Sequence, residues 1–128
     1  MNTKLAVAFL LAVSLFISVP LFAHHGSAAY DMTKTIMLKA TVTGWLWANP
    51  HCVLQFDVKD DKGNVEHWGS EVSNPADMVR RGWNSQSFKA GDEVTLTVNQ
   101  AKSGAHVARI EQAVLANGQT LSYSLRPQ

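Results

Sequence analysis

Short segments in which apolar and polar residues alternate constrain the fold of this chain more than any other feature. Residues 36–43, 52–58 and 94–99 all place an apolar side chain at about every second position. This is the period of a β-strand with one buried face. The sequence therefore predicts a mainly β protein, in which one strand faces the core with Cys52, Leu54, Phe56 and Val58.

Turn and helix signals divide the rest of the chain. The Asp-Asp-Lys-Gly-Asn segment at 60–64 is typical of a hairpin loop, so residues 65–72 are predicted to return as a strand. Residues 74–82 begin with Asn-Pro, carry an acid in the first turn and end in glycine, which predicts a helix of about two turns. A further strand is expected over 106–114, and the Asn-Gly pair at 117–118 predicts a hairpin.

The predicted order is three strands, a short helix and two strands, followed by that last hairpin. A small OB-like five-stranded barrel, with the helix between strands 3 and 4, is the most economical way to close this order. A small open β-sandwich is the alternative. In either case residues 36–128 form a single domain, preceded by a flexible lead-in of small and polar residues at 24–35.

Residues 1–23 have the features of a secretory signal peptide. Lys4 supplies the positive charge, and residues 5–19 form an uncharged apolar stretch. This stretch is shorter than the roughly 20 residues that span a bilayer. We expect cleavage after Ala23, with a second small-residue site after Ala29. The protein is therefore predicted to be periplasmic or secreted, without a stable membrane anchor after cleavage.

The composition of the cleaved chain excludes some functions. Removing residues 1–23 leaves 105 residues with ten basic and ten acidic side chains, a balance that argues against nucleic-acid binding. Cys52 is the only cysteine, so the chain folds without an internal disulfide. Stability must therefore come from a packed core.

Two adjacent histidines follow the predicted cleavage site. Cleavage after Ala23 would give His24 a free amine beside its imidazole, and together they could chelate one ion. His25 offers a second imidazole or a deprotonated amide, and His51 offers a third side chain from the folded domain. Nitrogen ligands of this kind favour Cu(II). The alternative is that His24 and His25 are solvated residues of a disordered lead-in.

Tryptophan and arginine pairs give a second candidate surface. Trp45 and Trp47, if exposed, would form a stacking platform for a sugar, a peptide or a partner protein. If Gly44 forms a bulge, the faces exchange and one or both tryptophans turn into the core. Arg80 and Arg81 would form an anion patch or, alternatively, a solvated helix face.

Enzyme chemistry is not favoured, and we predict no catalytic residues. The sequence has no pair of acidic residues within one recognisable motif, no nucleophile elbow and no phosphate-binding glycine-rich loop. His67 and His106 fall within strand patterns, where partly buried, hydrogen-bonded imidazoles are expected. Cys52 neighbours His51, but alternation sends the two side chains to opposite faces, so Cys52 is predicted to be a core residue.

Several of these segments resemble an uncharacterised family of small exported bacterial proteins, a domain of unknown function. The resemblance covers nearly the whole cleaved chain. It implies export and a compact β domain, and it implies no particular reaction. The matching segments are Ala23-His24-His25-Gly26-Ser27, Trp47-Ala48-Asn49-Pro50-His51, the turn at 60–64, Arg80-Arg81-Gly82-Trp83 and Gly91-Asp92-Glu93-Val94.

Overall fold

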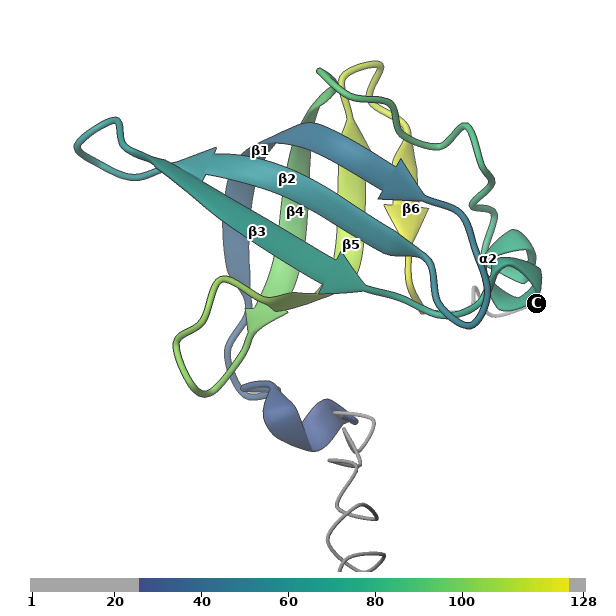
Figure 1. The fold of residues 1–128 in the computed structure, drawn as a ribbon, viewed down its shortest axis with the longest axis horizontal. Helices are drawn as coiled ribbons and strands as arrows, with labels where there is room; N and C mark the ends of the chain where they lie inside the picture. Colours follow the sequence, from purple (N-terminus) through teal and green to yellow (C-terminus); the bar gives the residue numbers. More distant parts are fainter. Residues whose placement is uncertain (1–25, 125–128) are drawn as a thin grey trace, which may run out of the picture.

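The computed structural model describes residues 26–124. Six antiparallel strands form one sheet in the order β3-β2-β1-β4-β5-β6, with one short α-helix (Figure 1). The mainly β prediction is confirmed. The predicted signal peptide, His24 and His25 lie outside the described residues. The elements are the 3-10 helix η1 (Ser27–Ala29), β1 (Ile36–Leu46), β2 (Val53–Lys59), β3 (Val65–Glu71), α2 (Pro75–Arg80), β4 (Glu93–Gln100), β5 (Ala108–Leu115) and β6 (Thr120–Ser122).

The central strand is β1, which pairs with β2 on one side and with β4 on the other. Its alternation is as predicted: Ala40 and Val42 are buried, whereas Lys39 and Thr43 are exposed. The register between β1 and β2 shifts between Val42 and Gly44, which confirms a bulge at this position. Beyond the bulge the two faces of β1 exchange, and this exchange determines where the following tryptophans lie.

The helix forms as its capping residues predict. The Asn74 side chain accepts a hydrogen bond from the Asp77 N–H at 3.0 Å, and Pro75 occupies the first helical position. Gly82 follows the helix with φ +86°, a conformation that residues with a Cβ rarely adopt. The helix lies between β3 and β4, where the sequence places it.

One apolar core lies inside the curved sheet. Each strand from β1 to β5 contributes buried side chains to it, and α2 contributes Met78. Trp83, just after the helix, is only 1 % exposed, and its indole N–H donates to the Ser122 carbonyl at 3.0 Å. The five predicted strands are all present, and the Asn-Gly hairpin adds β6 as a sixth beside β5.

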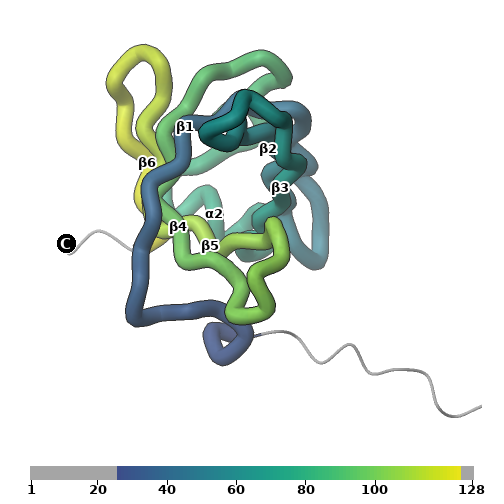
Figure 2. Tube along the Cα trace, turned by 90° about the vertical axis from the view of Figure 1, so that its left-hand side faces the viewer, coloured from purple at the N-terminus to yellow at the C-terminus, as the bar shows by residue number. Residues whose placement is uncertain are grey.

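The sheet curves until β3 approaches the start of β5 (Figures 1 and 2). Gly69 of β3 and Val107 form an isolated parallel bridge, and the Gly69 N–H donates to the His106 carbonyl at 3.1 Å. In the ladder of named strands the sheet is open between β3 and β6.

The described part of the lead-in packs along β4 and the loop after it. Tyr30 bridges Ala101, and the Asp31 N–H donates to the Gln100 carbonyl at 2.9 Å. Asn99, only 1 % exposed, donates from its carboxamide nitrogen to the carbonyls of Asp31 and Lys34. Between residues 26 and 124 no helix has the length and apolar character needed to cross a membrane.

Candidate functional site

His51 is the one predicted metal ligand that lies within the described residues. It follows the Asn49–Pro50 pair in the β1–β2 connection, and its Nδ1 pairs with a carboxylate oxygen of Glu71 at the end of β3. Two backbone hydrogen bonds fix this pair, from the Cys52 N–H to Ser73 (3.0 Å) and from the Val72 N–H to Cys52 (2.9 Å). The His51 and Glu71 side chains are 31 % and 56 % exposed, so the pair is reachable from solvent.

Glu71 also lies close to the lead-in. The Tyr30–Ala101 bridge, the Ala101–Val107 hydrogen bond of 2.9 Å and the Gly69–Val107 bridge place these segments next to one another. Partial burial and the Glu71 carboxylate raise the pKa of Tyr30, while Arg109 acts in the opposite direction. The chain at Tyr30 therefore lies near the line where β3 meets the start of β5.

The structure describes no complete metal site. Within residues 26–124 no three His, Cys, Asp or Glu side chains are grouped so that they could hold an ion. Cys52 is fully buried, its sulfur lies 4.0 Å from the Ala48 carbonyl, and burial raises the pKa of the thiol. Cys52 is a core residue, as predicted. A site in which His51 is one of three such ligands would need at least one ligand from outside the described residues.

The other two histidines within residues 26–124, His67 and His106, pair with carboxylates other than Glu71. His67 Nδ1 is 2.6 Å from an Asp57 carboxylate oxygen, which confirms the expected hydrogen bond. Its side chain is 83 % exposed, so the expectation of partial burial is wrong for this residue, because His67 lies on the outer face of β3. His106 stacks on Trp68 with ring centroids 4.8 Å apart, and its Nε2 is 3.7 Å from Glu66.

Trp45 and Trp47 lie beyond the β1 bulge and pack against the core while remaining partly exposed. The Trp45 ring is 6.1 Å from Trp83 and 5.3 Å from Phe88 between centroids, and its indole N–H donates to the Asn84 carbonyl at 3.0 Å. This is the inward arrangement that we expected if Gly44 formed a bulge. Binding of a sugar, peptide or protein by this pair stays a prediction.

Arg80 and Arg81 share one carboxylate. Both guanidinium groups pair with Asp77, at 2.8 and 2.9 Å. Arg81 also donates to the Tyr123 carbonyl and lies 4.4 Å above the Tyr123 ring. Since Asp77 balances one of the two positive charges, the two arginines have less charge to offer an external anion.

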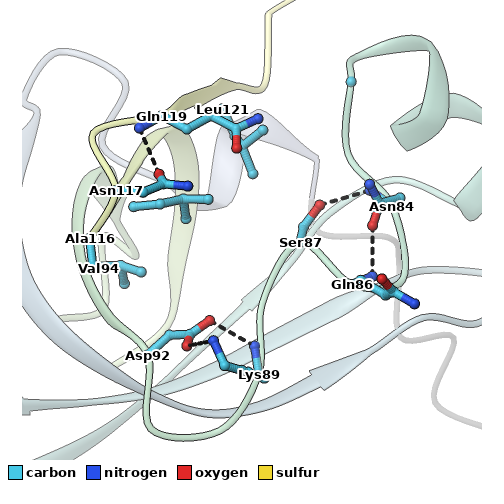
Figure 3. A pocket seen from close by; sticks show the side chains of 12 residues that line it. Asn84, Gln86, Ser87, Lys89, Asp92, Val94, Ala116, Asn117, Gln119 and Leu121 are labelled. Carbon is cyan, nitrogen blue, oxygen red and sulfur yellow. Dashed lines mark hydrogen bonds and ion pairs between the residues drawn. The ribbon is translucent and has the colours of Figure 1, made fainter.

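A polar groove of about 430 Å³ was not expected from the sequence (Figure 3). One wall is the segment that follows α2, and the other is the β5–β6 hairpin. These segments are distant along the chain, so no local motif joins them. The sequence signal for this groove is that both segments contain several asparagine and glutamine residues. The lining residues are Gly82, Asn84, Gln86, Ser87, Lys89, Asp92, Val94, Leu115, Ala116, Asn117, Gln119 and Leu121.

Comparison with known proteins decides the family. The model of DUF6152, a family of unknown function, matches residues 12–109. The chain belongs to this family. The DUF6152 match includes His24, His25 and His51, the first four strands, α2 and the start of β5. No curated protein and no solved structure matches the chain, so no activity comes from a relative.

Proposed function

We propose that this DUF6152 protein is exported to the periplasm or secreted, and that its cleaved form binds Cu(II) through His24, His25 and His51. The His24 amine and imidazole would chelate the ion, and His25 would add an imidazole or a deprotonated amide. His51 would bind from the folded domain. This set of nitrogen ligands suits the tetragonal preference of Cu(II).

The observation that carries the proposal is the pairing of His51 with Glu71. Metal-binding imidazoles commonly use one ring nitrogen for the ion, while the other donates to a carboxylate that fixes the tautomer and the ring orientation. The pairing of Glu71 with Nδ1 of His51 has this form.

The lead-in is anchored on the folded domain a few residues after His24 and His25. Tyr30 lies in the field of Glu71, the partner of His51. Four residues separate His25 from Tyr30 in the sequence, and three of them form η1. The anchoring of residues 29–34 on β4 and the following loop therefore supports convergence of the three histidines.

We further propose that β1 to β5 close as an OB-like barrel that carries this site. Three features support closure: the pairing of β1 with both β2 and β4, the position of α2 between β3 and β4, and the Gly69–Val107 parallel bridge. Slow hydrogen exchange of the Gly69 amide is the expected result. Exchange as fast as in an open loop would favour the open sandwich.

The first test concerns the N-terminus. Cell fractionation and N-terminal sequencing are expected to recover a protein that begins at His24 outside the cytoplasm. Retention in the cytoplasm contradicts export. A chain that begins after Ala29 removes His24 and His25 and with them the proposed site.

The second test concerns the metal. Cu(II) titration of the purified cleaved protein is expected to give one tight site that is weakened in both His24→Ala and His51→Ala. His67→Ala is the matched control, because His67 is an exposed histidine that pairs with Asp57. Equal affinity in wild type and His24→Ala would falsify the N-terminal chelate, while loss in His67→Ala as well would point to nonspecific histidine binding.

A further inference from the structure

The turn of the β5–β6 hairpin joins an exposed asparagine to an exposed glycine. Of the asparagines in the sequence, Asn117 alone is followed by glycine. Gly118 has φ +83°, and a glycine suits this position of a hairpin loop because a Cβ is strained at positive φ. The same lack of a side chain leaves the Gly118 nitrogen open to approach by a neighbouring group.

The Asn117 carboxamide is held close to that nitrogen. Its Oδ1 accepts a hydrogen bond from the Gln119 N–H at 2.9 Å, which Figure 3 shows. A bond from a side-chain oxygen to the N–H two residues further on is an Asx-turn, and it folds the side chain back along its own backbone. The carboxamide carbon is thereby kept near the Gly118 nitrogen. The donor on Oδ1 also favours negative charge on this oxygen.

We propose that Asn117 is a site of spontaneous deamidation. The Gly118 nitrogen loses its proton and attacks Cγ of Asn117, which forms a new C–N bond and places negative charge on Oδ1, where the Gln119 N–H stabilises it. The bond from Cγ to Nδ2 then breaks, ammonia leaves, and a five-membered succinimide ring remains. Water opens this ring at either of its carbonyl groups and leaves an aspartyl or an isoaspartyl residue. The proposal does not depend on export or on copper binding.

The hairpin controls how fast this reaction runs. The Gly118 N–H donates to the Leu115 carbonyl at 2.9 Å, and the Leu115 N–H donates to the Gln119 carbonyl at 2.8 Å. The first bond must open before the Gly118 nitrogen can lose its proton and attack. We therefore expect the reaction to be roughly tenfold slower in the folded protein than in an unstructured peptide, since one hydrogen bond supplies a factor of about this size.

Deamidation changes the groove that Asn117 lines. The charged residues of the lining, Lys89 and Asp92, pair with each other, so either product adds a negative charge to a groove that is otherwise balanced. The isoaspartyl product also lengthens the main chain of the turn by one carbon, next to the Leu115–Gln119 bond that closes the hairpin. The modification therefore acts both on the charge of the groove and on the hairpin that forms one of its walls.

The test incubates the folded wild-type protein at mildly alkaline pH, which favours loss of the proton from the attacking nitrogen, and digests samples over time for mass spectrometry. Asn117 is expected to be the first asparagine to become an acid, and an isoaspartyl methyltransferase is expected to methylate part of the product. Asn84 is the matched internal control. Its Oδ1 accepts from the Gln86 N–H at 2.7 Å in the same kind of turn, but Ser85 follows it instead of glycine. No change at Asn117, or an equal rate at Asn84, overturns the proposal.

A peptide and a variant complete the test. A capped peptide of residues 114–120 is expected to deamidate roughly tenfold faster than Asn117 in the folded protein, and equal rates contradict control by the hairpin. Asn117→Gln is expected to abolish the reaction in the hairpin, because glutamine would have to form a less favourable six-membered ring. If the hairpin of this variant still becomes acidic at the wild-type rate, the reaction does not arise at Asn117 and the proposal is overturned.

Discussion

Glu71 is the residue through which the fold would control the proposed metal ligand. Its carboxylate holds Nδ1 of His51, so Glu71→Gln leaves the imidazole in place but removes the charge that orients it. Cu(II) affinity, measured by competition with a chelator, is expected to fall about tenfold. Glu93→Gln is the control, since Glu93 is exposed on β4 and bonds to Thr41 rather than to His51. Unchanged affinity in Glu71→Gln would remove the orienting role of this carboxylate.

Asp77 gives a prediction for the pH dependence of stability. The hydrogen bond from Arg81 lowers the pKa of Asp77 in the folded protein. A lowered folded-state pKa stabilises the fold above the ordinary carboxyl pKa, and the stabilisation is lost as pH falls through the lowered value. Asp77→Asn should therefore reduce the free energy of unfolding by about 1 kcal/mol at neutral pH.

Urea unfolding at neutral pH and at about pH 2.5 measures this difference, which is expected to shrink at the acidic pH. Asp61→Asn, exposed in the β2–β3 loop, is expected to match wild type at both values. If Asp77→Asn lowers the free energy of unfolding by the same amount at both pH values, the loss does not come from the charge of Asp77.

At the scale of elements, α2 depends on its N-cap. The Asn74 side chain satisfies the Asp77 N–H, so Asn74→Ala is expected to cost about 1 kcal/mol in the free energy of unfolding. Val79→Ala in the same helix is the control, because Val79 is 59 % exposed and should change stability little. Equal stability of the two variants in thermal unfolding would contradict a capping role.

The secondary-structure elements also show which features of the fold can be predicted from the sequence. Alternation predicts β1, β2 and β4, and cap residues predict α2, because each of these signals is local. Gly44 indicates a bulge, but its register depends on how Gln55 and its neighbours pair across the sheet. The contact between Glu71 and His51 and the groove beside β6 join segments distant in sequence. Local patterns therefore do not predict them.

At the scale of the whole molecule, the anchoring of the lead-in on β4 links folding to the proposed site. Asn99 is almost fully buried and donates to two lead-in carbonyls, at 3.2 and 3.0 Å. Asn99→Ala removes both bonds and is expected to destabilise the protein by roughly 1–3 kcal/mol. Hydrogen exchange of the Asp31 amide, which bonds to Gln100, should accelerate as the lead-in loosens.

The same change should weaken copper binding without altering any proposed ligand. A loosened lead-in lowers the effective concentration of the N-terminal chelate at His51, so Cu(II) affinity is expected to fall several-fold. Asn117→Ala is the control, because Asn117 bonds within the β5–β6 hairpin and its loss should leave copper affinity unchanged. If Asn99→Ala accelerates exchange at Asp31 but binds Cu(II) as tightly as wild type, the N-terminal histidines bind independently of His51. The folded domain would then take no part in holding the metal.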